Sequence, residues 1–295
     1  MRILLLGGNG MAGHILAAYL SRQSGYEVEA TIRPHVGKSF GTGTGIPSLP
    51  RLSGVPLHEL DAEDLPAVRQ TVERVRPDII VNAIGILNRH AEEQPLLAYT
   101  VNGLLPHWLA HAAGEIGARL IHISSDCVFS GARGSYGEEE LPDGYTVYAK
   151  SKALGEIRDP RHLTIRTSII GPEIREDGIG LLKWFLSRKG IVPGYVNVPW
   201  NGVTTLELAK AAAWAIEHPQ VGGLVHLTAP EPISKHRLLE LVRHAYGRTD
   251  LELRPVPEPA IDRTLQPTKS GFGHKPPGYS AMLEELAEWE RTDRL

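Results

Sequence analysis

The sequence has one cysteine, little net charge and no long hydrophobic run, and each of these absences excludes a class of protein. Cys127 alone cannot form a disulfide within the chain, which suits a reducing cytoplasm. A formal net charge of −3 over 295 residues gives no sign of a nucleic-acid-binding surface. The first apolar run stops at Gly7 and Gly8, too early for a signal peptide or a membrane span. We therefore expect a cytoplasmic protein that binds neither nucleic acid nor membrane.

Short apolar runs alternate with longer amphipathic runs through the first half of the chain. The pattern predicts strands at residues 3–6, 28–32, 57–60, 79–81 and 120–123. It predicts helices between them at residues 11–21, 65–75 and 96–116. Strands that alternate with helices are typical of a parallel sheet covered on both faces. We therefore predict an α/β fold with a Rossmann-type doubly wound parallel sheet.

The second half of the chain continues this alternation less regularly. A further strand is expected at residues 163–166, and helices are expected at residues 181–187, 234–246 and 281–290. Proline and glycine become dense between Ile191 and Gly202, which indicates loops there. The Gly-, Pro- and Ser-rich segment at residues 34–54 is longer than a routine connection, and the sequence assigns it no role.

Three glycines, Gly7, Gly10 and Gly13, lie between the first predicted strand and the first predicted helix. The first permits a tight turn, the second lets the backbone approach a pyrophosphate, and the third lets the helix pack closely on the sheet. Met11 and Ala12 complete the turn, and the helix N-terminus supplies N–H donors for phosphates. The spacing differs from the simpler dinucleotide fingerprint, whose first two glycines are two apart. A plain glycine-rich turn is the alternative, but the flanking strand and helix favour a dinucleotide site.

The end of the second predicted strand indicates which dinucleotide binds. Enzymes that use NAD usually place a carboxylate there for the ribose 2′-hydroxyl, and this chain has Arg33 instead. A guanidinium can pair with a 2′-phosphate, so NADP(H) is the preferred cofactor and NAD(H) is the alternative. Arg33 could also be a solvated loop charge. Residues after the third and fourth strands are expected to contact the cofactor as well: Asp61, Ala62, Ala83, Ile84 and Gly85.

Three side chains suit the reduction of a carbonyl group. Tyr148 and Lys152 are four residues apart, so they share one face of a helix. A phenol can donate a proton, and an ammonium one turn away lowers the phenol pKa towards neutrality and can hold the nicotinamide ribose. Ser125 follows the strand at 120–123, where its hydroxyl can orient a substrate oxygen. A surface helix with a solvated lysine is the alternative, but the serine and the glycine turn favour a catalytic set.

Several other residues have two readings each. Asn102, in the helix at 96–116, either holds a water for proton relay or is a hydrogen-bonded core residue. Trp184 and Trp200 either line a sugar pocket or fill the core. The basic residues of the tail either hold a diphosphate or are solvated, and we predict the first role for Arg263 among Arg263, Lys269, His274 and Lys275.

These motifs resemble the extended short-chain dehydrogenase/reductase family, and within it the branch of dTDP-4-dehydrorhamnose reductases and related nucleotide-sugar 4-ketoreductases. The resemblance covers nearly the whole chain. The motifs that carry it are GGNGMAG at 7–13, PDIIVNA at 77–83, VN at 101–102, HISSDCVFSG at 122–131, YAKSKALGE at 148–156, RTSIIG at 166–171 and NGVTT at 201–205.

The resemblance implies NADPH-dependent reduction of the 4-keto group of a nucleotide-diphosphate 6-deoxy sugar. The family's triad falls on Ser125, Tyr148 and Lys152, and Ser125 and Asp126 are expected to contact the substrate. We expect residues 1–160 to form mainly the NADP-binding Rossmann domain. Residues 161–295 are expected to complete the sheet and form a smaller substrate-binding α/β cap, and a homodimer through the sheet-covering helices is plausible. Cys127 stands where rhamnose-type reductases usually have tyrosine, so the identity of the sugar stays open.

Proteins with two other functions carry a similar motif pattern. One is a nucleotide-sugar epimerase that retains its NAD(P) cofactor, and the other is a non-catalytic regulatory subunit like the β subunit of methionine adenosyltransferase. A 4,6-dehydratase is disfavoured, because Cys127 stands where those enzymes carry a glutamate base. No histidine partner is motif-linked to Cys127, so we interpret it as a small buried side chain. The thirteen histidines lack metal-ligand spacing, and we predict no metal site.

Overall fold

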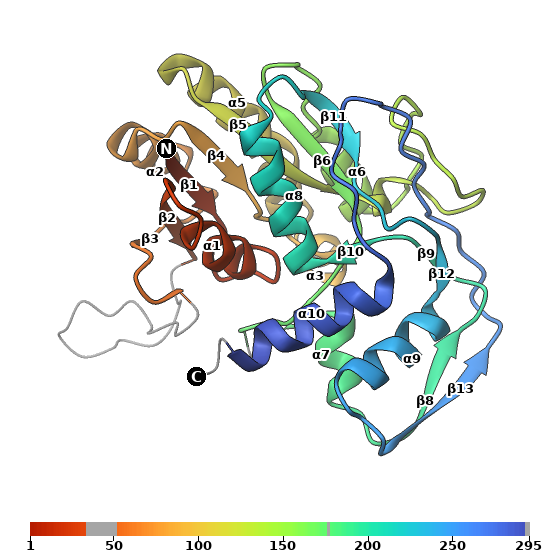
Figure 1. Cartoon of the computed structure of the whole chain (residues 1–295). Coiled ribbons are helices and arrows are strands. Elements are labelled where there is room, and N and C mark those ends of the chain that lie inside the picture. Colours follow the sequence, from red (N-terminus) through yellow and green to blue (C-terminus); the bar gives the residue numbers. More distant parts are fainter. Residues whose placement is uncertain (34–51, 176–177, 293–295) are drawn as a thin grey trace.

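The computed structural model describes residues 1–33, 52–175 and 178–292, so most of the unassigned segment at 34–54 lies outside the described residues. A central parallel sheet carries helices on both faces, and a smaller group of elements lies beyond one end of it (Figure 1). Among the described residues, no helix has both the length and the apolar character needed to cross a membrane.

Seven parallel strands form the central sheet in the order β11-β6-β5-β4-β1-β2-β3. Their bounds are β1 Arg2–Leu6, β2 Glu27–Ile32, β3 Leu57–Glu59, β4 Ile79–Asn82, β5 Arg119–Ser125, β6 Leu163–Thr167 and β11 Gly223–His226. The order runs outwards from β1 in both directions, which places the topological switch point between β1 and β4. The predicted Rossmann-type parallel sheet is therefore confirmed.

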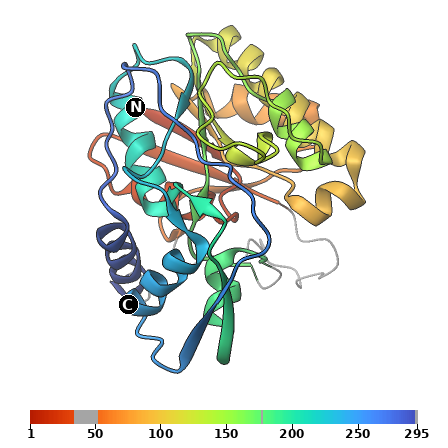
Figure 2. The ribbon, with the colours of Figure 1, turned by 90° about the vertical axis from the view of Figure 1, so that its right-hand side faces the viewer.

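Helices cover both faces of the sheet because its strands are apolar on both sides. One face holds α1 (Gly13–Ser21), α8 (Thr205–Glu217) and α10 (Tyr279–Thr292), and the other holds α2 (Leu65–Val75) and α5 (Leu105–Ile116). In β1, Ile3 and Leu5 pack in the first core, whereas Leu4 and Leu6 pack in the second. Figure 2 shows α8 and α10 on one side of the sheet, with α2 and α5 on the other.

The helix predicted at residues 96–116 is divided into three parts. After α3 (Asn88–Glu93), the chain forms α4 (Pro95–Ala98), a π-helical turn η2 (Tyr99–Leu104) and then α5. Pro106 stands in the first turn of α5, where a missing N–H costs little. Single π-helical turns of this kind often accompany functional regions.

Hydroxyl caps fix where the two helices nearest the site begin. Thr146 caps α6 (Val147–Leu154), and Ser234 caps α9 (Lys235–Ala245). In each case the side-chain oxygen accepts a hydrogen bond from the backbone N–H three residues on, at 3.0 Å. The caps therefore define the orientation from which the first side chains of both helices leave the backbone.

The smaller group of elements follows β6 along the chain and reaches beyond the lower end of the sheet in Figure 1. It contains α7 (Leu181–Leu186), α9, and the parallel pair β8 (Gly190–Tyr195) and β13 (Leu251–Val256). Short pairs connect it to the sheet: β9 (Pro199–Trp200) with β12 (Ile233–Ser234), and β7 (Ile169–Ile170) with β10 (Val203–Thr204). The helices predicted at 181–187, 234–246 and 281–290 are confirmed, with ends shifted by one or two residues.

Candidate active site

The glycine-rich turn joins β1 to α1, and at Gly7 and Gly13 it leaves no room for a side chain. Gly7 has a φ of +90°, which L side chains rarely adopt. A Cβ at Gly13 would lie 1.9 Å from the carbonyl oxygen of Gly7, so the first turn of α1 packs directly on the strand end. Ala12 is the Ncap of α1, and no side chain caps the helix. Bare backbone at a helix start is the arrangement that accepts a phosphate group, so the turn fits a dinucleotide.

Other residues predicted to contact the cofactor follow β2, β3 and β4 at the same edge of the sheet. Arg33 is exposed directly after β2, and Asp61 is exposed shortly after β3. Ala62 packs in the core beneath α2. After β4, Ile84 touches the glycine turn, because a Cβ at Gly7 would lie 3.0 Å from its Cγ1. The structure thus brings Ile84 to Gly7 and places Arg33 and Asp61 at neighbouring strand ends.

Met11, Ala83 and Gly85 complete the predicted cofactor set. A Cβ at Gly180, the residue before α7, would lie 3.2 Å from the sulfur of Met11. Ala83 is half-buried and packs against the core that contains α1. Gly85 is exposed, and a Cβ there would lie 3.8 Å from Oδ1 of Asn102. Met11 therefore links the glycine turn to the start of the smaller group of elements.

Ser125, Tyr148 and Lys152 meet where β5 ends and α6 begins. Ser125 is the last residue of β5, and its Oγ donates to Oδ1 of Asp126 at 3.1 Å. Tyr148 and Lys152 are both buried on α6. The Nζ of Lys152 donates to the carbonyl oxygen of Ile123, two residues before Ser125, at 2.7 Å. This hydrogen bond attaches α6 to β5 and brings the predicted triad together.

The expectation that Lys152 lowers the pKa of Tyr148 is wrong for the structure described. Burial raises the phenol pKa well above its ordinary value, and Cys127 and Asp126 act in the same direction. Hydrogen bonding with the Ser125 side chain acts against them. Lys152 has no such effect because its ammonium is turned to the Ile123 carbonyl, and burial lowers its own pKa to about 8. Tyr148 is therefore protonated at neutral pH, as a proton donor must be, but burial makes its phenol a weaker acid than an ordinary tyrosine.

Asn102 is a hydrogen-bonded core residue, the second of its two predicted roles. It is fully buried in η2, and its Oδ1 accepts from the N–H of Ile86 at 2.8 Å. Its Nδ2 donates to the carbonyl of Ile86 at 2.9 Å and to Oγ of Ser151 at 3.0 Å. Both amide hydrogens are therefore engaged, and the side chain joins the segment after β4 to the middle of α6.

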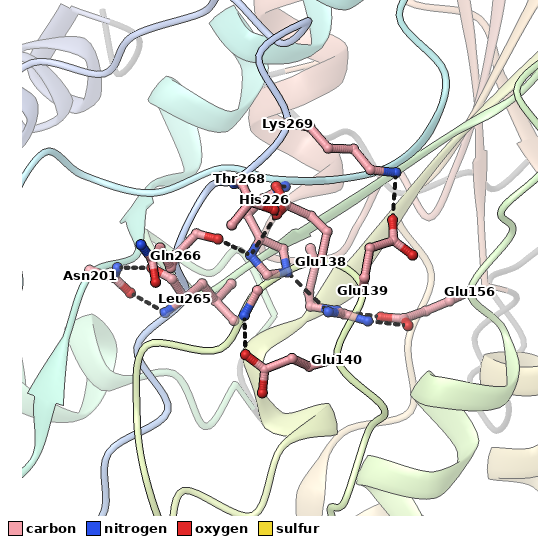
Figure 3. A network of polar contacts seen from close by, with 12 residues as sticks. Glu138, Glu139, Glu140, Glu156, Asn201, His226, Leu265, Gln266, Thr268 and Lys269 are labelled. Carbon is pink, nitrogen blue, oxygen red and sulfur yellow. Dashed lines mark hydrogen bonds and ion pairs between the residues drawn. The ribbon is translucent and has the colours of Figure 1, made fainter.

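A buried polar network joins the segment after α6 to β5, β6 and β11, and part of it is drawn in Figure 3. Glu156, just after α6, accepts from Oγ of Ser124 at 2.8 Å and pairs with Arg166 of β6 through bonds of 2.8 and 2.6 Å. Arg166 also donates to Nε2 of His226 on β11 at 3.0 Å. Since an arginine can only donate, Nδ1 of His226 holds the ring proton and donates to the carbonyl of Gln266 at 3.1 Å.

The residues after β5 form the side of the site that faces the tail. Asp126 and Cys127 lie in a short 3-10 turn, η3 (Asp126–Val128). Burial raises the pKa of the Cys127 thiol to about 12, which supports a packing role over a nucleophilic one. Arg263 reaches this segment, because its Nε donates to the carbonyl of Phe129 at 2.9 Å. Within the described ranges, no group of three His, Cys, Asp or Glu residues could hold a metal ion.

The other basic residues of the tail and the two tryptophans have clear positions. Lys269 pairs with Glu139 at 3.1 Å and His274 with Glu207 at 2.7 Å. Lys275 is exposed. Trp184 is half-buried against the core, and Trp200 is buried with its Nε1 donating to Oγ of Ser168 at 2.8 Å. Of the four basic residues, Arg263 is thus the one held against the segment that follows the triad serine.

Sequence reasoning missed Lys235, the first residue of α9. Its Nζ lies 4.5 Å from the centroid of the Trp200 ring, and the charge of Asp126 acts on it. No motif links residue 235 to the triad, which is more than 80 positions earlier in the chain. The sequence predicted a helix at 234–246, but this prediction says nothing of what the helix faces.

Comparison with known proteins identifies relatives over most of the chain. The family model described as RmlD substrate binding domain matches residues 1–275. A dTDP-4-dehydrorhamnose reductase of Streptomyces griseus is 36% identical over 300 residues, covering 98% of this chain and 90% of that protein. The dTDP-4-dehydrorhamnose reductase of Salmonella typhimurium is 29% identical over 243 residues, covering 76% and 80%. Methionine adenosyltransferase 2 subunit beta of Xenopus laevis is 24% identical over 253 residues, covering 77% and 75%.

Solved structures share the fold. The dTDP-4-dehydrorhamnose reductase of Bacillus anthracis, in complex with NADP, matches with a TM-score of 0.75 and 20% identity, covering 97% of this chain and 98% of that chain. The resemblance predicted from the motifs is confirmed by these relatives together. The family model matches residues 1–275, and the Streptomyces griseus relative is 36% identical over 98% of this chain. The chain therefore belongs to the RmlD substrate binding domain family.

Proposed function

We propose that this protein reduces the 4-keto group of a nucleotide-diphosphate 6-deoxy sugar, with NADPH as the preferred reductant. The observation that carries the proposal is the meeting of Ser125, Tyr148 and Lys152, fixed by the 2.7 Å bond from Lys152 to the end region of β5. The activity named for the Streptomyces griseus and Salmonella typhimurium relatives supports it. So does the glycine turn, where Gly13 packs on the backbone of Gly7 and no side chain caps the start of α1.

In the proposed reaction, each residue of the chain has one task. When bound, the reduced nicotinamide supplies the hydride. The phenol of Tyr148 gives its proton to the keto oxygen, and burial favours the protonated phenol that this step requires. The hydroxyl of Ser125 orients that oxygen by a hydrogen bond. Lys152 holds α6 against β5 and provides an ammonium for the nicotinamide ribose.

The cofactor and domain assignments are part of the same proposal. Gly7, Gly10, Met11, Ala12 and Gly13 would hold the pyrophosphate, with residues 1–160 mainly binding the dinucleotide. The preference for NADPH over NADH depends on Arg33, an exposed cation at the end of β2 where an NAD enzyme would place a carboxylate. The NADP complex of the Bacillus anthracis protein supports a nicotinamide cofactor in general. Residues 161–295 would complete the sheet and hold the nucleotide sugar, with Arg263 on its diphosphate.

The likeness to methionine adenosyltransferase 2 subunit beta favours a second candidate, a regulatory subunit without turnover. The complete triad supports catalysis, because a purely binding subunit has no use for a buried tyrosine and lysine aimed at one strand end. Co-purification with a larger enzyme, combined with no turnover of any keto sugar, would decide for the regulatory subunit. A nucleotide-sugar epimerase would instead isomerise its substrate with no net oxidation of NADPH.

The test of the proposed reductase is stoichiometric oxidation of NADPH on addition of dTDP-4-dehydrorhamnose or its UDP counterpart. Tyr148→Phe removes the proton donor, and we expect kcat to fall by about 10² to 10⁴-fold. Tyr145→Phe is the matched control, because that phenol is 72% exposed and its loss should leave kcat unchanged. Normal turnover by Tyr148→Phe would contradict the proposed role of the phenol. Absence of oxidation by the unmodified protein with both substrates would contradict the reductase itself.

A further inference from the structure

Lys235 stands at the edge of the smaller group of elements that faces the sheet. It opens α9 directly after β12, and its backbone N–H donates to the carbonyl of Val198 at 2.9 Å. The antiparallel pairing of β12 with β9 sets Ile233 opposite Trp200. The ammonium of Lys235 lies over the face of that tryptophan, 4.5 Å from the ring centroid. Two strands and a helix start therefore fix where this charge sits.

A short series of contacts connects this position to the catalytic residues. Ser125, the end of β5, is in register with Thr167 at the end of β6. Ser168 follows Thr167, and its Oγ accepts the hydrogen bond from Trp200 at 2.8 Å. Lys235 covers the same ring. The electrostatic influence of Asp126 on Lys235 agrees with this path, since that residue directly follows Ser125. The ammonium therefore lies on the side of the triad that faces the tail.

The charge of Lys235 has no direct protein partner in the part of the chain that the structure describes. No carboxylate lies within 4.0 Å of its Nζ and no acceptor forms a hydrogen bond with it, although the side chain is half-buried. Lys210 and Lys269, in contrast, each have a glutamate partner. Burial lowers the pKa of Lys235 to about 8, and Asp126 only partly opposes that effect. A partly desolvated cation without a counter-ion costs stability, so the position calls for a ligand that supplies negative charge.

We propose that Lys235 binds an anionic oxygen of the substrate, either of a phosphate or of a sugar carboxylate, beside the group that is reduced. This rests on the proposed function, because it takes a nucleotide sugar as the ligand of the site; the carboxylate case would make that sugar a uronate in place of a 6-deoxy sugar. Arg263, held against the same segment by its bond to the carbonyl of Phe129, is a second cation on this side. Cys127 stands where rhamnose-type reductases usually have tyrosine, and Lys235 lies over the Trp200 ring. The site can therefore recognise the charge of a ligand as well as its shape.

The test measures binding of three probes to the NADPH-saturated protein by titration calorimetry: dTDP, dTDP-glucose and dTDP-glucuronate. Lys235→Met keeps the length of the side chain and its contact with Trp200 but removes the charge, whereas Lys235→Arg keeps the charge. We expect Lys235→Met to raise Kd at least 10-fold for the probe that carries the recognised anion, and Lys235→Arg to raise it less than 3-fold. Lys150→Met is the control, since Lys150 is exposed on α6 and should leave every Kd unchanged.

The pattern over the three probes identifies the anion. Equal weakening of dTDP and dTDP-glucose assigns Lys235 to a phosphate, and weakening confined to dTDP-glucuronate assigns it to a sugar carboxylate. If the Met variant binds all three as tightly as the unmodified protein does, Lys235 is only a distant counter-charge for Asp126 and the inference is overturned, with the reductase proposal intact. If the unmodified protein binds none of the probes, both proposals are overturned.

Thermal unfolding gives a second readout that does not depend on the probes. If the ammonium of Lys235 serves to bind a ligand, it has no partner in the ligand-free protein. The Lys235→Met variant should therefore unfold at the same temperature as the unmodified protein or at a higher one. If Lys235 were instead part of a structural pair with Asp126, its removal would leave a carboxylate uncompensated and lower the unfolding temperature. A lower temperature together with unchanged affinities would therefore overturn the inference.

Discussion

At the scale of single residues, the approach of Gly13 to Gly7 determines how closely α1 can pack on β1. The strand end and the helix start touch through backbone alone, and no side chain caps the first turn of α1, so its N–H groups are left for the proposed pyrophosphate. A hydrogen bond holds the same turn to β2: the backbone N–H of Gly8 donates to the carbonyl of Thr31 at 2.7 Å. A side-chain methyl group at residue 13 would overlap the backbone of Gly7.

Gly13→Ala should therefore weaken both the fold and the binding of the dinucleotide. Its Cβ would lie 1.9 Å from a backbone oxygen, and relieving an overpacked contact of this kind typically costs about 1–3 kcal/mol. We expect the free energy of unfolding to fall by that amount in urea titrations, and the Kd for NADPH to rise at least 10-fold. Gly114→Ala is the matched control, because Gly114 is exposed within α5 and a Cβ there meets nothing within 4 Å. That control should be stabilised by about 0.5–1 kcal/mol, and a similar loss in both variants would contradict the argument.

Short motifs made the main site residues predictable. The strand, turn and helix around Gly7 and the four-residue spacing of Tyr148 and Lys152 are local patterns, so one sequence contains them complete. Lys235 could not be found in this way, because its relation to Ser125 is created by the pairing of β12 with β9. The direction of the Tyr148 pKa was also beyond the sequence, since it depends on burial and on where the Lys152 ammonium points.

At the scale of elements, the position of α6 depends on its contact with the π-helical turn η2. Gly103 and Gly155 let the two segments approach, because a Cβ at Gly155 would lie 2.0 Å from the carbonyl oxygen of Asn102. Asn102 then connects η2 to Ser151 in the middle of α6. Since Tyr148 and Lys152 lie on α6, this packing sets where the phenol and the ammonium stand relative to β5.

Asn102→Ala should disturb that arrangement without touching the triad. It leaves the N–H and the carbonyl of half-buried Ile86 without their side-chain partner, and each such group costs about 1–3 kcal/mol, whereas the Ser151 hydroxyl still donates to the carbonyl of Tyr148 at 3.0 Å. We expect a loss of about 2–4 kcal/mol in the free energy of unfolding, together with a fall in kcat that exceeds any change in the KM for NADPH. Asn197→Ala, at an exposed residue with one hydrogen bond, should lose less than about 1 kcal/mol. Equal losses at the two positions would show that Asn102 has no special role.

The strands that the sequence did not predict are those that depend on pairing with a strand distant in sequence. The strand β8 contains Pro193 and Gly194, and its local composition indicates a loop. It is a strand because it pairs with β13 about 60 residues later, with six residues in register. Similarly, β11 is a four-residue run that becomes the edge of the sheet by pairing with β6. By contrast, the alternation of the first half was enough to place its strands within one or two residues.

At the scale of the whole molecule, one buried network joins parts of the chain that are distant in sequence. Arg166 and His226 come from neighbouring strands, and Glu156 follows α6. Glu138, from the segment before α6, accepts from the backbone N–H groups of His226 and Thr268 at 3.2 and 2.8 Å (Figure 3). The tail is thus fixed across the end of the sheet by the same network, and its position depends on His226 remaining neutral.

The network predicts that acid weakens the fold through His226. Burial lowers the pKa of this histidine from 6.5 to about 4, and Arg166, which donates to its Nε2, acts in the same direction, whereas Glu138 at 3.9 Å from Nδ1 acts against them. Between those values the unfolded chain binds a proton that the native protein does not, so the free energy of unfolding rises with pH in this window and falls as pH is lowered from 6.5 towards 4. Urea titrations at a series of pH values measure this slope. In His226→Gln, which can still accept from Arg166 but cannot titrate, the slope should be shallower. His111→Gln, at a side chain that is 74% exposed, should leave the slope unchanged, and an unchanged slope in His226→Gln as well would rule out His226 as a source of the acid sensitivity.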